Sequence, residues 1–269
     1  MNLLCIHFGV SKRILAFIHF IKSNYSITLN HYNVFNEQEF LNLKNKEIKL
    51  YDGIILLGVG REETLLKVND PNDNSFVDLF QSKCHLDCVK KYYPKILDLI
   101  NQLITLNHRT PILGICYGAQ VLNNYYGGSL SYVPDSGIQG NLKTWYSNHC
   151  VLFKNIKGEY FPLYNHNFIM ENNHSKIIAI NESSNINSGF QYTQNHFSLA
   201  FHLQHSDEKG YQVIDNFISL MREKKPTLYL YIMIILLIMV IILNYFFSFK
   251  NLNNYLIIFL IIILFETFI

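Results

Sequence analysis

One stretch of this chain, residues 109–128 (RTPILGICYGAQVLNNYYGG), restricts its fold more than any other. Pro111–Leu113 has the pattern of a short buried strand, and Ala119–Tyr126 has the pattern of a helix. Only a glycine-flanked turn separates them, with Cys116 at its apex. Strands that lead directly into helices are typical of sheets whose parallel strands are covered by helices. The stretch therefore predicts an α/β fold with Cys116 at an edge of the sheet.

The position of Cys116 also predicts chemistry. Gly114 and Gly118, two residues to either side, let backbone and substrate approach the side chain closely. Because the N-terminus of the following helix directs its dipole at the sulfur, we expect a lowered thiol pKa and a reactive thiolate. Free cysteine is also among the most frequently buried residue types, so this motif alone does not distinguish a nucleophile from a core residue. A catalytic role needs a base elsewhere in the chain.

The rest of residues 1–222 alternates short apolar runs with amphipathic stretches. This pattern predicts an open, mostly parallel sheet flanked by helices, as in flavodoxin-like α/β folds. The predicted strands are residues 3–8, 25–29, 53–57, 111–113, 130–133, 150–153, 168–170, 176–180, 189–192 and 198–203. The predicted helices are residues 11–23, 92–106, 119–126 and 214–221.

Charge and cysteine content argue against several other classes of protein. The net charge is +2, and the lysines and arginines are scattered, so no basic surface for nucleic acid is predicted. Five cysteines without the spacing of a disulfide framework favour free thiols in a reducing compartment. Cys84 and Cys88 would share a helix face, but no second Cys/His pair complements them, so we predict no metal site.

Composition changes abruptly after Pro226. Leu228–Phe247 contains no charged residue, and about 20 apolar residues match the hydrocarbon thickness of a bilayer. We predict a membrane anchor over residues 223–269, with one transmembrane span at 227–249 and a second at 252–269 that would complete a hairpin. The second run is shorter, so an interfacial or re-entrant tail is the alternative.

The flanking charges predict the orientation of this anchor. Arg222, Lys224 and Lys225 directly precede the first span. Because positively charged residues beside a span stay on the cytosolic side, we expect the N-terminal domain of this membrane protein to face the cytosol.

His202 is the best candidate for the base. It lies at the end of a predicted apolar strand, and open α/β folds place their sites where the carboxyl ends of parallel strands meet. From there His202 would take the thiol proton and later protonate a leaving amine. His149 is nearer to Cys116 in sequence and would suit an isomerase or protease, but no motif surrounds it.

Three blocks, in this order along the chain, resemble the class I glutamine amidotransferases and their γ-glutamyl peptidase and hydrolase relatives. Residues 51–60 (YDGIILLGVG) are similar to the strand and glycine-rich oxyanion loop of that family. Residues 111–128 resemble its G-x-C-x-G-x-Q nucleophile elbow. Residues 201–204 (FHLQ) resemble its F-H-P-E histidine motif. The resemblance extends over about residues 1–222.

The resemblance implies a role for individual residues. Cys116 would be the nucleophile, His202 the base and Gln120 a substrate contact. Backbone amides of Tyr117 and of Gly58 or its neighbours would stabilise the oxyanion. In this family a glutamine side-chain amide is attacked, a γ-glutamyl thioester forms, ammonia or an amine leaves, and no cofactor is required.

The histidine block also departs from the family pattern. Gln204 stands where the family has the glutamate that completes its triad. A neutral amide can orient an imidazole but cannot offset the charge of an imidazolium. A shifted register offers His205 with Asp207 as an alternative base pair that restores a carboxylate.

Other features bear on the subclass. Gly58–Arg61 lacks the double glycine of the family, which leaves the oxyanion donor on that side open. The insertion from Asp70 to Phe80 resembles the γ-glutamyl hydrolase branch, whereas Tyr117 resembles the domains linked to synthetases. Tyr164–Asn167 resembles the loop that lines the substrate cleft, with a surface turn as the alternative.

These observations lead to two hypotheses. The first is a membrane-anchored cysteine amidohydrolase that cleaves a γ-glutamyl amide, either alone or as an ammonia donor to a synthetase partner. The second, motivated by Gln204 and the altered oxyanion loop, is a catalytically impaired homologue that serves as a membrane-tethered binding or scaffold module.

Overall fold

The structure is a computed structural model that describes residues 1–9, 12–45, 51–59, 83–106, 109–133, 138–166, 168–203 and 208–222. These residues belong to one compact unit, Met1–Arg222. No helix within these ranges is long and apolar enough to cross a membrane. The predicted spans at 227–249 and 252–269 lie outside the described residues.

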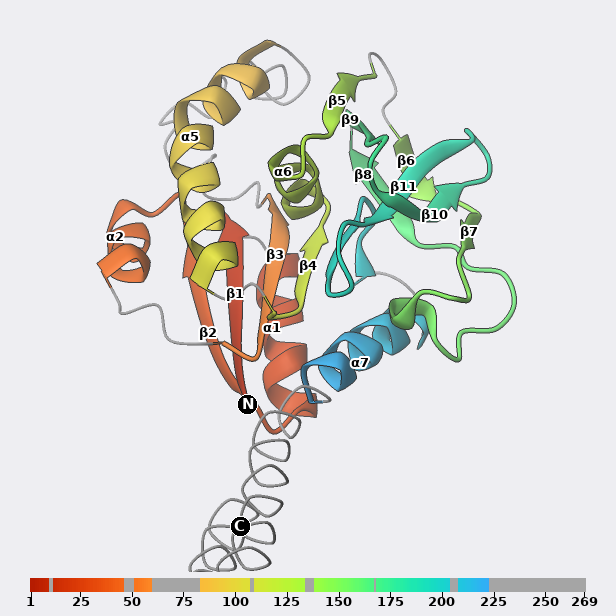
Figure 1. The fold of residues 1–269 in the computed structure, drawn as a ribbon, viewed down its shortest axis with the longest axis horizontal. Helices are drawn as coiled ribbons and strands as arrows, with labels where there is room; N and C mark the ends of the chain where they lie inside the picture. The colour runs from red at the N-terminus through yellow and green to blue at the C-terminus, as the bar shows by residue number, and fades with distance from the viewer. Residues whose placement is uncertain are drawn as a thin grey trace, which may run out of the picture. The chain divides into compact units, whose positions relative to one another are not determined.

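A large mixed sheet forms the centre of this unit (Figure 1). Among the described residues it has eight strands in the order β2-β1-β3-β4-β12-β11-β10-β7. The first five strands in this order are parallel to one another, and the last three extend the sheet in antiparallel pairs. The bounds are β1 Asn2–Phe8, β2 Thr28–Asn33, β3 Gly53–Val59, β4 Ile112–Ile115, β7 Thr144–Tyr146, β10 Lys176–Asn181, β11 Ile186–Gln191 and β12 His196–Leu199. The predicted α/β class with a mostly parallel sheet is confirmed.

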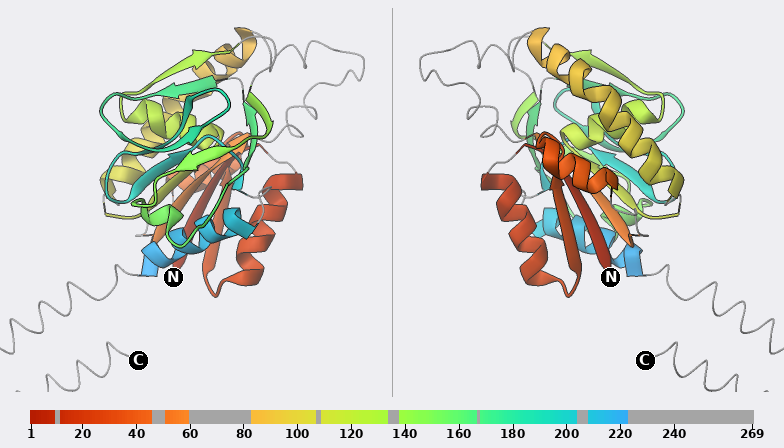
Figure 2. Two further views of the ribbon diagram at one scale, coloured as in Figure 1. Left: turned by 90° about the vertical axis from the view of Figure 1, so that its right-hand side faces the viewer. Right: turned by 90° about the vertical axis from the view of Figure 1, so that its left-hand side faces the viewer.

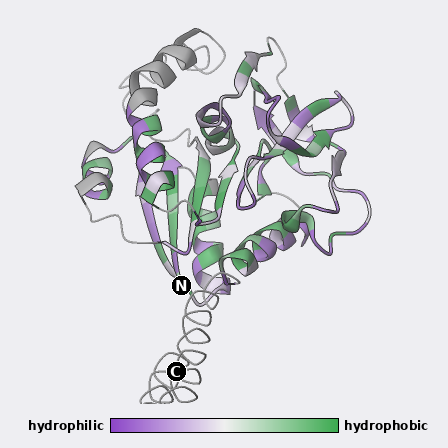
Figure 3. Cartoon of the chain, viewed as in Figure 1, coloured by the Kyte–Doolittle hydropathy of each residue, from purple (hydrophilic) through white to green (hydrophobic). Residues whose placement is uncertain are grey.

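Helices cover both faces of the sheet (Figure 2). One hydrophobic cluster joins the sheet to α1 (Lys12–Asn24) and α7 (Glu208–Arg222). A second cluster joins the opposite face to α2 (Glu37–Asn45), α5 (Lys83–Leu106) and α6 (Tyr117–Tyr125). The hydrophobic colouring of the central strands agrees with this burial on both faces (Figure 3), as is usual for parallel strands.

Two small antiparallel sheets and a short helix complete the described chain. β5 (Ser129–Tyr132) pairs with β9 (Phe168–Glu171), and β6 (Ile138–Asn141) pairs with β8 (Leu163–His166). The 3-10 helix η1 spans Val151–Phe153.

The predicted strand at 150–153 is wrong, because this segment forms η1. The Cys150 N–H donates to the Ser147 carbonyl and the Phe153 N–H to the Cys150 carbonyl, so these hydrogen bonds close locally. Leu152 and Phe153 are buried. An apolar run of four residues is compatible with a buried turn as well as a strand, and periodicity alone does not separate them.

Several other boundaries also differ from the predictions. The strand predicted at 25–29 begins only at Thr28 and continues to Asn33, and the strand predicted at 198–203 ends at Leu199. The final helix begins at Glu208, six residues before its predicted start. The sequence analysis did not anticipate α2, β6, β7 or β8.

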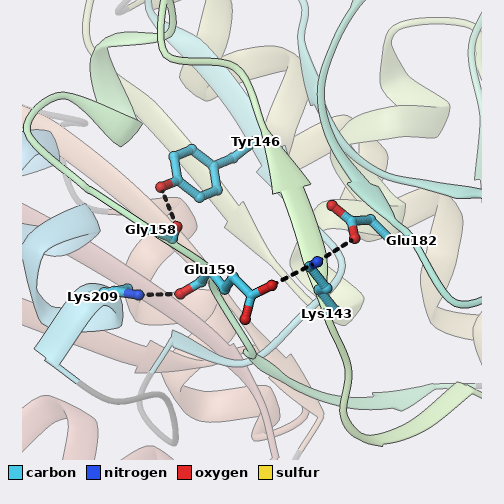
Figure 4. A network of polar contacts seen from close by, with 6 residues as sticks. All are labelled: Lys143, Tyr146, Gly158, Glu159, Glu182 and Lys209. Atoms are coloured by element: carbon cyan, nitrogen blue, oxygen red, sulfur yellow. Dashed lines mark hydrogen bonds and ion pairs between the residues drawn. The ribbon is translucent and has the colours of Figure 1, made fainter.

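Polar contacts fix the outer edge of the sheet (Figure 4). Lys143 Nζ lies 2.7 Å from Glu159 Oε1 and 3.3 Å from Glu182 Oε2, and Lys209 donates to the Glu159 carbonyl. Tyr146 OH donates to the Gly158 carbonyl at 2.7 Å. The three side chains of the ion pairs are solvent-exposed, so these pairs orient the edge more than they stabilise the fold.

Asn216 joins α7 to η1, and its loss should destabilise the unit. Its buried Nδ2 donates to the Leu152 carbonyl at 2.9 Å and to the Lys154 carbonyl at 2.8 Å. We predict that Asn216→Ala lowers the free energy of unfolding by about 1–3 kcal/mol, because these carbonyls lose their donor. Ser219→Ala, on the exposed side of α7, is the control and should change stability by less than about 0.5 kcal/mol. Denaturant unfolding of the full chain measures both, and equal stability of the two variants would contradict the assignment.

Candidate active site

The chain turns sharply at Cys116, where β4 ends and α6 begins. Cys116 has φ 55° and ψ −113°, a positive-φ conformation that is costly for a residue with a side chain. Its N–H donates to the Leu199 carbonyl of β12 at 2.9 Å, and its carbonyl accepts from the N–H groups of Ala119 and Gln120 at 3.0 and 3.2 Å. The surrounding hydrogen bonds therefore hold Cys116 in a strained turn of the kind that the sequence predicts.

Two glycines make this turn sterically feasible. A methyl group added to Gly118 would lie 2.1 Å from the Leu56 carbonyl oxygen of β3. One added to Gly114 would lie 2.7 Å from the Gly118 carbonyl oxygen. Both glycines are needed because backbone approaches them closely, as the sequence analysis expected.

Cys116, His202 and Gly58 border one small space. A methyl group built on Gly58 would lie 3.2 Å from Cys116 Cβ, 3.5 Å from Cys116 Sγ and 3.7 Å from His202 Cε1. Cys116 and His202 are each only 9% exposed. The carboxyl ends of β3 and β4 and the segment after β12 thus bring together the thiol, the imidazole and a glycine backbone.

The backbone around His202 is held on both sides. The His202 N–H donates to the Leu163 carbonyl of β8 at 2.8 Å, and the Ala200 N–H donates to the Ser188 carbonyl of β11 at 2.8 Å. His202 therefore lies just beyond the end of β12, supported by two other strands.

The expected lowering of the Cys116 thiol pKa is wrong. Burial raises this pKa to about 11, and a hydrogen bond from the backbone N–H of Tyr117 lowers it by less. The free energy lost when the thiolate is removed from water exceeds the stabilisation that the backbone N–H at the start of α6 gives it. Cys116 is therefore a neutral thiol at rest, and it depends on a base to become a nucleophile.

The other predicted site residues divide into two groups. Tyr117 and Gln120 lie in the first turn of α6 and are each 5% exposed, and the Tyr117 ring packs edge-on against Phe8, with 4.8 Å between ring centroids. Gln204, together with the alternative pair of His205 and Asp207, lies outside the described residues, so the choice of base remains a prediction.

The segment 164–166 belongs to strand β8 and does not form a surface turn. His166 is buried beside Tyr164, and burial lowers the pKa of its imidazole to about 4, so the ring is neutral near pH 7. His149 is exposed. The sequence analysis missed the support that β8 gives to His202, although alternate residues of LYNH are buried, as in a strand with one covered face.

The cysteine predictions can be compared with the structure in part. Cys5, Cys116 and Cys150 are free, buried thiols, as expected. Cys84 and Cys88 both fall within α5. In the described ranges, no group of three or more His, Cys, Asp or Glu residues is placed to hold a metal ion.

Comparison with protein families identifies the class of this site. Residues 89–220 match the glutamine amidotransferase class-I family. This stretch begins in α5 and includes Cys116 and His202, so residues 89–220 correspond to a class I glutamine amidotransferase domain.

Solved structures show the same fold. A protein from Thermoplasma acidophilum, described as part of a GMP synthase, is 18% identical, with a TM-score of 0.56 over 83% of this chain and 94% of that one. A glutamine amidotransferase from Thermotoga maritima is 18% identical, with a TM-score of 0.53 over 84% of this chain and 86% of that one. No curated protein sequence matches the chain. The family match, together with the fold and the site, supports an amide-hydrolysing enzyme.

The close approach of the Cys116 turn to β3 predicts different effects of alanine substitution at two glycines. Gly118→Ala should lower the free energy of unfolding by about 2 kcal/mol or more, because its methyl group would overlap a backbone carbonyl that cannot move aside. Gly58→Ala adds the same methyl group at ordinary contact distances from most of its neighbours and is the matched control. Thermal unfolding of both full-length variants measures the difference. A Gly118→Ala protein as stable as Gly58→Ala would show that the turn is not as close to β3 as described.

The raised thiol pKa predicts slow alkylation of Cys116 at neutral pH. Because only the thiolate reacts, the rate with iodoacetamide should rise about tenfold per unit between pH 7 and 9, and it should level off only near pH 11. Peptide-resolved mass spectrometry separates Cys116 from the other cysteines. A plateau already reached at pH 8 would contradict this prediction and would indicate a preformed thiolate.

Proposed function

We propose that this protein is a membrane-anchored cysteine amidohydrolase that cleaves the γ-glutamyl amide bond of glutamine or of a γ-glutamyl conjugate. One observation carries the proposal. The Cys116 sulfur and the His202 ring both lie within contact distance of the same point above Gly58. A nucleophile and a general base that border the same space at a strained strand-to-helix turn are the two groups that acyl transfer requires at least.

The proposed reaction begins with the neutral thiol. His202 takes the proton as the Cys116 sulfur attacks the γ-carboxamide carbon. The resulting tetrahedral oxyanion collapses to a γ-glutamyl thioester, and His202 gives its proton to the leaving ammonia or amine. Water, deprotonated by His202, then attacks the thioester, and the proton returns to the thiol as glutamate leaves.

Backbone amides would stabilise the oxyanion in this reaction. The Tyr117 N–H already points at the sulfur, because it forms the hydrogen bond that lowers the thiol pKa. The Gly58 backbone borders the same space and would supply a second donor. Losing one such donor typically costs about 10²–10³ in rate. Gln120, buried in the first turn of α6, is the proposed contact for the glutamyl group.

The raised pKa of Cys116 makes the proposed reaction strongly dependent on its base. At neutral pH the thiolate is scarce, so attack requires proton transfer to His202 in the same step. An imidazole is suited to this transfer because its ordinary pKa lies near neutrality.

The proposed product is either glutamate with free ammonia or ammonia passed to a partner. The structurally similar Thermoplasma protein is described as part of a GMP synthase, and that description favours a role as ammonia donor to a synthetase. The insertion between Asp70 and Phe80, which resembles the γ-glutamyl hydrolase branch, favours a stand-alone hydrolase. Ammonia release in the absence of any other protein distinguishes the two.

The membrane anchor is part of the proposal and rests on the sequence of residues 223–269. A methyl group on Gly53, at the start of β3, would lie 2.6 Å from Met221 Sδ, so α7 ends beside the amino edge of the sheet. Gly58 and the proposed site lie at the other end of β3. The proposed cytosolic orientation of the N-terminal domain rests on Arg222, Lys224 and Lys225, which directly precede the first predicted span.

Gln204 supports a second candidate, a catalytically impaired homologue that binds a ligand or partner without turnover. A diazo-ketone analogue of glutamine distinguishes these two candidate functions, because it forms a covalent bond only with a competent nucleophile. Selective modification of Cys116 supports the amidohydrolase, and a folded protein that is not modified supports the binding module.

The central prediction is glutamate release that depends on Cys116 and His202. The full chain in detergent should release glutamate from glutamine or a γ-glutamyl amide. Cys116→Ala and His202→Ala should each lower kcat by about 10³-fold or more, because nucleophile and base act as one unit. Cys150→Ala removes a buried thiol directly before η1 and should keep the activity. Equal rates for the wild-type and Cys116→Ala proteins would end the proposal.

A further inference from the structure

A buried cluster of hydroxyl groups lies beside the segment that carries His202. Tyr164 OH of β8 donates to Ser188 Oγ of β11 at 3.0 Å and lies 2.8 Å from Thr144 Oγ1 of β7. Thr144 Oγ1 also lies 3.0 Å from the Leu142 carbonyl oxygen, so its single proton is donated either to that carbonyl or to the Tyr164 hydroxyl. Tyr164 and Ser188 are each 1% exposed and Thr144 is 3% exposed. The cluster thus links three strands through one tyrosine hydroxyl.

The same strands hold the backbone on both sides of Phe201. The residue before Tyr164, Leu163, accepts the His202 N–H through its carbonyl, and Ser188 accepts the Ala200 N–H through its own carbonyl. Any shift of Tyr164 or Ser188 would therefore be passed to the residues that flank Phe201.

Phe201 is also enclosed by aromatic rings. Its ring lies edge-on to Tyr164, with 5.5 Å between centroids, and edge-on to Tyr160, with 5.7 Å between centroids. All three side chains are at most 1% exposed. Because close-packed interiors transmit displacements, the position of the Tyr164 ring constrains Phe201 and with it the start of the His202 side chain.

Packing alone does not require the hydroxyl groups of this cluster. Burying a hydroxyl costs free energy unless it is hydrogen-bonded, and satisfied polar clusters fix a single arrangement of the groups around them. A phenylalanine at position 164 would fill the same space without specifying how β8 lies against β7 and β11. The hydrogen bonds of the Tyr164 hydroxyl thus fix the position of β8 at the point where the Leu163 carbonyl accepts the His202 N–H.

Fixing the position of β8 matters more in a chain that has Gln204 where related domains have a carboxylate. A carboxylate that accepts a hydrogen bond from an imidazole fixes its orientation, and a neutral amide does so without offsetting the imidazolium charge. We propose that Tyr164, through its hydrogen bonds to Ser188 and Thr144 and its packing on Phe201, is a positioning residue that sets the His202 imidazole against the Cys116 sulfur. The proposal rests on the proposed roles of Cys116 and His202.

The first test is the kinetics of Tyr164→Phe in the full chain. This variant keeps the ring and removes only the hydroxyl. We expect kcat with glutamine to fall about tenfold, with KM changed less than about twofold, because the loss affects transition-state geometry and not substrate binding. Ser188→Ala removes a hydrogen-bond partner of Tyr164 but keeps the backbone carbonyl, and it should lower kcat in the same way.

Tyr146→Phe is the matched control. Its hydroxyl donates to the Gly158 carbonyl in the outer contacts of the same sheet, as Figure 4 shows. Its loss should leave kcat unchanged even if the unfolding temperature falls slightly. If Tyr164→Phe and Tyr146→Phe have the same kcat, the positioning role of Tyr164 is wrong.

A second readout does not depend on turnover. The ¹³Cε1–¹H resonance of His202, assigned by its absence from His202→Ala, reports the surroundings of the imidazole directly. We expect Tyr164→Phe to shift or broaden this resonance and Tyr146→Phe to leave it in place. An unchanged resonance in Tyr164→Phe would overturn the proposal even in an active enzyme. A shifted resonance in a protein whose wild type releases no glutamate would retain the positioning role and reject the proposed function.

Discussion

The close packing of the Cys116 turn against β3 and β12 is the constraint on which the site depends. The N–H of Cys116 is bound by the Leu199 carbonyl, and Gly118 lies so near Leu56 that no side chain fits between them. These contacts hold Cys116 in a positive-φ conformation that an isolated chain would avoid. The parallel order β3-β4-β12 thereby determines where the thiol stands and which backbone faces it.

The same packing explains why the thiol is weakly acidic. A cysteine at the start of a helix gains from the helix dipole, but the effect is modest and is confined to the first turn. Enclosing the sulfur among Gly58, His202 and the elbow removes it from water, and this desolvation dominates. The arrangement favours a mechanism in which the thiolate exists only while the base holds the proton. In the proposed reaction, the enclosure that keeps the Cys116 thiol protonated would also make the nucleophile dependent on His202.

The parts of the structure that the sequence predicted are those determined by local pattern. The elbow around Cys116 combines a buried strand, two glycines and an amphipathic helix, and each has a short-range signature. The enclosure of His202 was not predicted, because β6, β7 and β8 are strands of three or four residues whose partners are distant in sequence. The prediction of a strand at Cys150–Phe153 was wrong for a related reason. Its apolar residues are buried against α7 and do not pair with another strand.

The two halves of the sheet therefore have different tasks. The parallel strands β3 and β4 present the glycine backbone and the thiol, as a nucleophile elbow requires. The antiparallel strands β11 and β7, together with β8, support the segment that follows β12 and so determine where an imidazole can stand. The four-residue sequence motif around His202 contains none of the residues of these supporting strands, so it does not reveal their contribution. In the proposed active site, the surrounding strands and the motif would together orient the imidazole, so Gln204, in place of the glutamate of related domains, would remove only one of several constraints on it.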